Sequence, residues 1–324
     1  MAVVRDSDSI YHRLFSHPKM VADLLRAFLD DALQADLDLE QLRRHNTKLT
    51  AWKGERRLSD VVWEIPTRQG GSVFILLILE FQSGVEEWMA LRFNVYTGLI
   101  YQQLVEEREL KAAEGLPPVL PVLLFNGENR WHAATHNHHL IRLQEGSSLR
   151  KFQPEMRYYL IDEGAYPKET LEESPSLSAI LFRMEHPANP EEMVRAAQDA
   201  AEWFKKHPDG PAVKHLFQEL LLAGLARLHV DTPPNVPENF QEVVVMLAAR
   251  VEKWAMEYKQ KGRQEGQQEG ERKGKAEMLL DLLQDRFGSV PDWLRSKLVE
   301  ADMDSLKGWS KKIFGAEKIE QIFQ

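Results

Sequence analysis

The 324-residue sequence contains no cysteine, which excludes disulfide bonds and thiolate zinc sites and fits a reducing compartment. It also lacks a long apolar run, because the longest, residues 73–79, is far shorter than the ~18 residues that a membrane span needs. The opening six residues already include Arg5 and Asp6, so no secretory signal is expected. We therefore expect a cytoplasmic protein without a membrane partner.

Positive charge is scarce as well. The sequence has 41 Lys and Arg against 50 Asp and Glu, a net charge of −9, so there is no overall basic field to attract nucleic acid. Any contact with DNA must come from a local patch or through a bound cation. The apolar share of 43% is still enough for one large domain or two smaller ones.

The spacing of apolar residues changes along the first half of the chain. Helical spacing over residues 10–29 is followed by alternation and then by stretches that are apolar on both faces, which predict strands. The strands are expected over residues 58–65, 73–81, 119–125 and 156–162, with a long helix over residues 86–108. This order predicts an α/β core with a mixed central sheet over residues 1–168.

The second half has a mostly helical pattern, which predicts a helical extension over residues 169–258 and a small helical C-terminal domain over residues 276–324. Between them, over residues 259–275, glycine recurs at every fourth position: Gly262, Gly266, Gly270 and Gly274. In a helix these glycines form one stripe that lets another helix approach, although each costs about 1 kcal/mol relative to alanine. The alternative is a solvated linker of fluctuating helicity.

Two carboxylates occupy strand positions where an unpaired charge is costly. Glu80 directly follows the apolar stretch 73–79, and Asp60 lies in the preceding strand-like segment. Neighbouring strands can bring two such side chains together, and paired carboxylates suit Mg²⁺, which polarises a phosphodiester and makes hydroxide available near neutral pH. The alternative is that each acid lies at the surface end of its strand. The first interpretation predicts the core of a metal-dependent nuclease.

The residues after Glu80 extend this prediction. Phe81 separates Glu80 from Gln82, so positions 80 and 82 share one face of the sheet, and the Phe81 carbonyl could add a metal ligand. Gln82 could orient a water molecule or hold a phosphate oxygen, but an amide cannot act as a general base.

Five ordered segments resemble the recombination-promoting nuclease (Rpn, YhgA-like, transposase-like) family of the PD-(D/E)xK superfamily. Residues 9–18, SIYHRLFSHP, are similar to its opening motif, and RLSDVVW at 57–63 is similar to its first core strand. LEFQS at 79–83 matches its E-x-Q strand, WMALRFNVY at 88–96 its next helix, and LPPVLPVLLFNG at 116–127 the strand after that. The glycine repeat and the Arg286-Phe287-Gly288 unit resemble a tail domain that is often fused to these proteins.

The resemblance implies a restriction-endonuclease-like core and an Mg²⁺- or Mn²⁺-dependent DNA endonuclease that promotes recombination, with Asp60 and Glu80 as metal ligands. Gln82 stands where the wider superfamily usually has lysine. Family members commonly share this glutamine, so activity is not excluded, and without the lysine a slow or weak nuclease is expected. His12 stands where lysine is more usual in the opening motif, and no role is carried over to it.

Further site residues are predicted from position. Asp8 opens the first helix, where superfamily members often add an acid to the metal site, although a plain N-cap is the alternative. Arg92, Tyr96 and Gln103 could form a polar stripe that faces phosphate, or an ordinary solvated helix face. Glu64 shares a face with Asp60 but lies too far along the strand for the same metal.

The remaining features leave alternatives open. The histidines at 132, 136, 138 and 139 suggest zinc, but without an ordered acid or a cysteine a polar loop is favoured. No third acid has the spacing of a DDE-type transposase. The C-terminal domain suggests self-association, with a dimer as the default. The alternative function is a non-catalytic DNA-binding or oligomerising protein with a degenerate nuclease fold, which the acidic charge and Gln82 favour.

Overall fold

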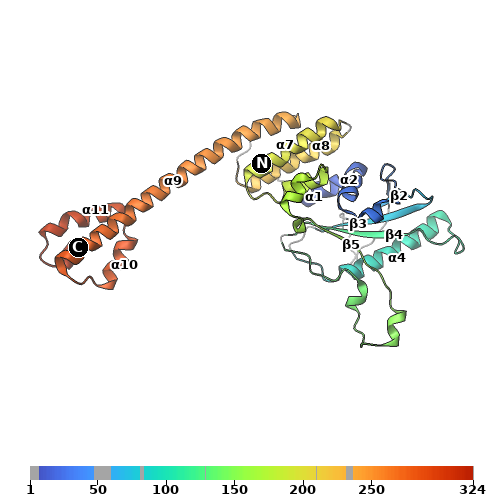
Figure 1. Ribbon diagram of the computed structural model, residues 1–324, viewed down its shortest axis with the longest axis horizontal. Coiled ribbons are helices and arrows are strands. Elements are labelled where there is room, and N and C mark those ends of the chain that lie inside the picture. The colour runs from blue at the N-terminus through green and yellow to red at the C-terminus, as the bar shows by residue number, and fades with distance from the viewer. Residues whose placement is uncertain are drawn as a thin grey trace. The chain divides into compact units, whose positions relative to one another are not determined.

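The computed structural model describes residues 7–46, 60–80, 84–127, 129–208, 210–230 and 236–323, apart from the side chains at positions 7, 8, 60, 254, 257, 258, 261, 265, 292 and 314. The chain divides into two compact units, Met1–Val251 and Glu252–Gln324. The first contains the sheet and the second is helical (Figure 1).

A five-stranded mixed sheet forms the centre of the first unit. The strands β1 (Arg43–His45), β2 (Asp60–Pro66), β3 (Ser72–Glu80), β4 (Val119–Phe125) and β5 (Tyr159–Asp162) lie side by side in sequence order. The pairs β1–β2 and β2–β3 are antiparallel, whereas β3–β4 and β4–β5 are parallel. The predicted mixed α/β core is confirmed.

The sequence explains why β3 is the central strand. Its residues from Phe74 to Glu80 are all buried, as expected of a strand with helices on both faces. Gly70 and Gly71 adopt φ of 95° and 86° in the turn that leads from β2 into β3. Residues other than glycine rarely adopt such a backbone conformation. The short turn fixes the register, with Asp60 opposite Ile78 and Pro66 opposite Ser72.

The helix α4 (Met89–Arg108) covers one face of the sheet, and α1 (Ser7–Leu14) and α2 (Pro18–Phe28) cover the other (Figure 1). On the α4 face, alternate residues of the strands pack with one stripe of the helix: Val62, Phe74, Leu76, Ile78, Leu123 and Phe125 against Met89, Phe93, Tyr96, Ile100 and Leu104. Because α1 begins at Ser7, Asp8 lies within its first turn and does not precede it as a cap.

The connection from β4 to β5 carries two 3₁₀ turns, η1 (Asn137–Leu140) and η2 (Ser148–Phe152). After β5 the chain forms a third, η3 (Glu163–Ala165), and then a helical layer. The helices of this layer are α5 (Lys168–Glu173), α6 (Leu177–Glu185), α7 (Pro190–Lys206) and α8 (Pro211–Arg227), and a short α3 (Asp31–Gln34) follows α2.

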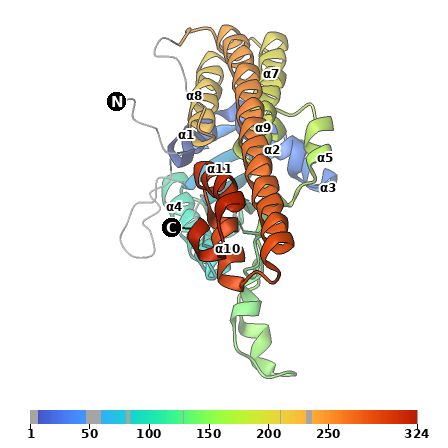
Figure 2. The same cartoon turned by 90° about the vertical axis from the view of Figure 1, so that its left-hand side faces the viewer.

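The helix α9 (Phe240–Phe287) contributes to both units, and the segment 259–275 is part of it. In the second unit the C-terminal part of α9 packs with α10 (Asp292–Glu300), α11 (Met303–Lys312), η4 (Ile313–Gly315) and η5 (Ile319–Ile322) (Figure 2). The core of this unit is apolar: Leu279, Leu283, Leu294, Leu298, Leu306 and Ile313. Across the part of the chain that the structure describes, no helix is long and apolar enough to span a membrane.

Candidate functional site

Glu80 is the last residue of β3, and only 4% of it is exposed. Alternation along the strand places it on the face that Phe74, Leu76 and Ile78 share, toward α4. Arg92, in the first turn of α4, is also buried, and its Nη1 lies 3.4 Å from Oε2 of Glu80. The buried carboxylate therefore has a cation beside it, which offsets part of its desolvation cost.

Asp60 is the first residue of β2. Its Cα partner on β3 is Ile78, two residues before Glu80, so positions 60 and 80 fall on one face of the sheet. The side chains of Asp60 and Asp8 lie outside the described part of the structure, as do Phe81 and Gln82 altogether. The backbone register thus brings the two predicted metal-ligand positions near each other, and their roles stay predictions.

The donor set fits a hard divalent cation. Carboxylate oxygens are what Mg²⁺ prefers, and Glu80 is held at a strand end with little exposure to solvent. Among the side chains that the structure describes, no three His, Asp or Glu residues gather closely enough to hold a metal ion. A metal site at Glu80 must therefore take its other ligands from Asp8, Asp60, Phe81 or Gln82, whose side chains the structure does not describe.

The three residues predicted to contact phosphate lie in different surroundings. Tyr96 is 1% exposed and belongs to the core between α4 and the sheet, with the Arg92 guanidinium carbon 5.4 Å from its ring centroid. Gln103 is half-buried and donates hydrogen bonds to the Asn46 carbonyl (2.9 Å) and the Glu107 carboxylate (2.6 Å). Their contacts with phosphate stay predictions.

Glu64 is separate from this site, as its place along the strand predicts. Arg108, in the last turn of α4, donates to its Oε2 at 2.6 Å, and Ser72 donates to its Oε1 at 2.9 Å. These partners, the Arg108 hydrogen bond first, lower the pKa of Glu64. Glu64 is therefore an ion-paired structural residue at the opposite end of β2.

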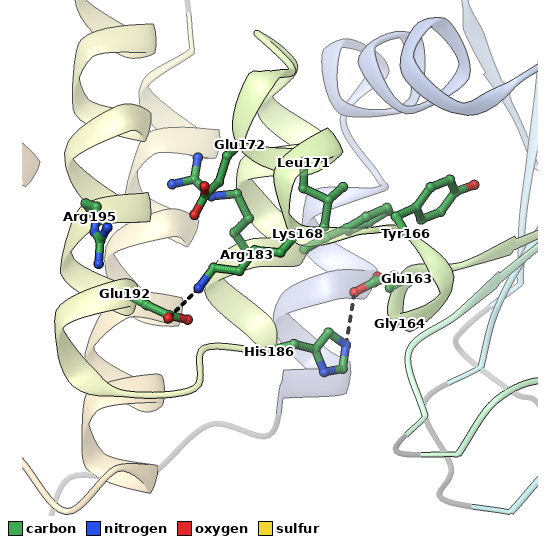
Figure 3. A pocket seen from close by; sticks show the side chains of 11 residues that line it. Glu163, Gly164, Tyr166, Lys168, Leu171, Glu172, Arg183, His186, Glu192 and Arg195 are labelled. Carbon is green, nitrogen blue, oxygen red and sulfur yellow. Dashed lines mark hydrogen bonds and ion pairs between the residues drawn. The ribbon is translucent and has the colours of Figure 1, made fainter.

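A second acidic centre follows β5. Glu163, in η3, is 1% exposed, accepts a hydrogen bond from the Tyr11 hydroxyl at 3.0 Å and has His186 Nε2 at 3.6 Å (Figure 3). Burial raises the pKa of Glu163 to about 7. The hydrogen bond with Glu163 raises the pKa of His186. Both groups therefore hold protons more tightly than they do in water.

Glu163 and His186 line a pocket of about 150 Å³ between η3, α5, α6 and α7 (Figure 3). The Lys168–Glu192 ion pair closes one side of it, and Arg195 stands at the rim. The lining carries both signs of charge, with Lys168, Arg183, Arg195 and His186 against Glu163, Glu172 and Glu192.

The prediction from sequence missed Glu163, although the signal that singled out Glu80 was present. Residues 159–161 are apolar or aromatic and are followed by Asp162-Glu163, an acid pair at the end of a strand. Asp162 is buried, accepts from the Trp131 backbone N–H at 3.0 Å and so fixes the start of the β4–β5 connection. No sequence pattern marks Tyr11 and His186 as its partners, because only the tertiary structure brings them next to Glu163.

The histidines of the β4–β5 connection form a ring cluster. The ring centroids of His138 and His139 are 4.1 Å apart, and each lies 5.4 Å from that of His136. Burial, and then the neighbouring His138 and His139, lower the pKa of His136. No acid joins them in a metal-holding group among the described residues.

Residues 5–212 match the family model described as "Putative transposase, YhgA-like". The chain belongs to this family. It is 27% identical over 120 residues to recombination-promoting nuclease RpnD of Escherichia coli O157:H7, which covers 37% of this chain and 45% of the relative. It is also 27% identical over 121 residues to inactive recombination-promoting nuclease-like protein RpnE of Escherichia coli strain K12, which covers 37% of this chain and 39% of the relative.

The chain thus spans less than half the length of these two curated relatives. No solved structure matches it. The resemblance inferred from the five sequence segments is confirmed at the level of the family.

Proposed function

We propose that this YhgA-like protein is an Mg²⁺- or Mn²⁺-dependent DNA endonuclease with a PD-(D/E)xK core that promotes recombination. The observation that carries the proposal is the placement of Glu80, a carboxylate 4% exposed at the end of β3, on the same sheet face as position 60 of the neighbouring strand. A buried carboxylate at such a place is costly unless it is paired or binds a metal ion, and the contact with Arg92 offsets only part of that cost. The nuclease name of one relative supports the choice of DNA as substrate.

In this proposal the carboxylates of Asp60 and Glu80 hold the cation, and the Phe81 carbonyl adds an oxygen. When bound, the cation polarises the phosphodiester and makes hydroxide available near neutral pH. Gln82 orients the attacking water or holds a phosphate oxygen, and it takes no proton. Since no lysine or other base occupies its position, turnover is expected to be slow.

Arg92 has a defined part in the same site. Its Nη1 is 3.4 Å from Glu80, so it balances the charge of Glu80 while no cation is bound. The protein acts as a homo-oligomer, with a dimer as the expected state.

Isothermal titration with Mn²⁺ tests the metal site without depending on turnover. We expect wild-type protein to bind one Mn²⁺, Glu80→Gln and Asp60→Asn to lose most of that affinity, and Glu64→Gln to keep it, since Glu64 is paired with Arg108. Equal binding by wild type and Glu80→Gln would contradict the assignment.

A second function is favoured by the same contact. With Arg92 beside it, the Glu80 carboxylate is already neutralised without a metal ion. One relative is also named inactive. On this alternative the protein binds DNA, or assembles on itself, without cutting. It predicts DNA binding with steep salt dependence, no Mn²⁺ uptake and no cleavage at any metal concentration.

A further inference from the structure

The β4–β5 connection, residues 126–158, is a basic segment of an acidic chain. It holds five Arg or Lys and three Glu, whereas the chain as a whole has a net charge of −9. We call this segment the arm. It extends away from the sheet and α4 in both views (Figures 1 and 2).

The base of the arm is attached to the strand end that bears Glu80. Asn126, which directly follows β4, donates its backbone N–H to the Glu80 carbonyl at 3.2 Å. His132 lies 3.5 Å from Glu87 in the segment between β3 and α4, and η1 packs against α4. The arm therefore starts at the candidate metal site.

The tip of the arm is exposed and carries both charge and apolar surface. In η2, Leu149 is 57% and Phe152 72% exposed, and Arg150 and Lys151 are exposed beside them. The Lys151 Nζ lies 5.2 Å from the Phe152 ring centroid. Folding gains nothing from such an exposed aromatic side chain, which suits a contact made with another molecule.

Of the five basic side chains of the arm, Arg130 lies 4.0 Å from the Asp162 carboxylate, and the other four have no acidic partner among the described residues. Within the part of the chain that the structure describes, Arg142, Arg150, Lys151 and Arg157 form no ion pair with a carboxylate. Guanidinium and ammonium groups without a carboxylate partner can bind the phosphates of a nucleic acid backbone. An exposed aromatic ring can stack on an unpaired base.

We propose that the arm is a DNA-binding element: Arg150 and Lys151 contact backbone phosphates and Phe152 stacks on an unpaired base, next to the strand end of Glu80. The inference rests on the proposed function for its choice of DNA. It assigns to the arm the local patch that a chain with a net charge of −9 needs to hold a polyanion. The preferred substrate region is DNA with an unpaired or distorted segment beside a duplex.

The test uses the full chain in EDTA, so that binding is measured without cleavage. Fluorescence anisotropy follows a labelled 30-base-pair duplex and the matching single strand over a series of NaCl concentrations. The variants are Arg150→Gln with Lys151→Gln, and Phe152→Ala. The matched control is Lys311→Gln with Lys312→Gln, which removes the same charge from an exposed pair on α11.

We expect the arm double variant to bind duplex about tenfold more weakly and the slope of log K against log salt to fall by about 2, since each phosphate contact contributes about 0.9. Phe152→Ala weakens single-strand binding by about fivefold or more and duplex binding less. The control stays within about twofold of wild type. Circular dichroism melting curves should coincide for all four proteins, because every substituted side chain is exposed.

An arm variant that binds DNA like wild type would overturn the inference. An equal loss of DNA affinity in the Lys311–Lys312 control would overturn it too, as would wild-type protein that binds anionic phosphatidylserine vesicles in place of DNA. Wild-type protein that binds no DNA at low salt would overturn it as well. Arm-dependent DNA binding without cleavage at any Mg²⁺ or Mn²⁺ concentration would leave the inference standing and refute the proposed nuclease function.

Discussion

At the scale of single residues, the Arg92–Glu80 pair decides how the buried acid is tolerated. Both side chains are less than a tenth exposed, and removal of one partner from a buried pair leaves an uncompensated charge. We expect Arg92→Met to lower the free energy of unfolding by about 3 kcal/mol, measured by urea denaturation at low ionic strength without metal.

The double variant with Glu80→Gln serves as the control for this prediction. It should recover a large part of the loss, because a neutral amide costs less to bury than an unpaired carboxylate. Mg²⁺ should raise the melting temperature of Arg92→Met more than that of wild type, since the cation replaces the lost charge. If Arg92→Met unfolds at the same urea midpoint as wild type, the Arg92–Glu80 contact contributes nothing to the free energy of unfolding.

Glu163 makes stability depend on pH. Its folded pKa of about 7 lies above the ordinary value of 4.5, so between these values the folded state holds a proton that the unfolded state has released. The contribution of Glu163 to the free energy of unfolding is complete below about pH 4.5 and is lost as pH rises toward 7. The raised pKa of His186 acts in the same direction, because its extra stability is lost as pH rises through the folded value.

We therefore expect the free energy of unfolding to fall by up to about 3 kcal/mol from pH 5 to pH 8 on account of Glu163. Glu163→Gln, which cannot ionise, should have a distinctly flatter profile over that range. Chemical denaturation at closely spaced pH values measures both proteins. Parallel profiles for the two would mean that Glu163 does not titrate in this window.

At the scale of elements, the strands that carry the site were predictable from sequence. The apolar stretches gave β4 over the predicted residues and β2 and β3 to within two residues, because strands buried on both faces leave a strong signal. The hairpin followed from Gly70-Gly71. Placing Glu80 at the end of β3 was thus possible before the structure, whereas its contact with Arg92 needed the packing of α4 on the sheet.

Other elements left no such signal. The strand β1, Arg43-Arg44-His45, is an exposed edge strand without an apolar residue and was not predicted. The cluster of Tyr11, Glu163 and His186 joins residues more than 150 positions apart, which local spacing cannot reveal. The sequence left open whether the glycine repeat at 259–275 is helix or linker, and the structure continues α9 through it to Phe287.

The glycines of α9 provide a prediction at this scale. A Cβ added at Gly266 or Gly270 meets no atom within 4 Å, so alanine fits there without strain. Each Gly→Ala change should stabilise the local helix by about 1 kcal/mol. Hydrogen exchange of the full chain should therefore show amides 262–274 exchanging about tenfold more slowly in Gly266→Ala with Gly270→Ala than in wild type.

Alanine at Gly308, an exposed glycine within α11 that is also free of near neighbours, is the matched control and should change exchange only in its own helix. Faster exchange at residues 262–274 in the double variant would instead indicate that the stripe contacts another helix closely. That outcome would favour the packing role of the repeat over a solvated helix.

At the scale of the whole molecule, the net charge of −9 must be reconciled with the polyanionic substrate that we propose. The proposed cation at Glu80 and Asp60 and the basic arm, which starts from the same strand end, would each supply positive charge locally. Neither feature depends on the second unit, Glu252–Gln324, whose own apolar core suits a separate role in assembly.

Cleavage of supercoiled plasmid tests the central claim most directly. Wild-type protein should nick it with Mg²⁺ or Mn²⁺ and not in EDTA. Asp60→Ala and Glu80→Ala should each lose about a hundredfold or more in rate, because a metal site supplies several kcal/mol and each 1.36 kcal/mol is tenfold. Glu64→Gln, on the same face of β2 but paired with Arg108, should stay within about twofold of wild type. Nicking that continues unchanged in both alanine variants would contradict the account.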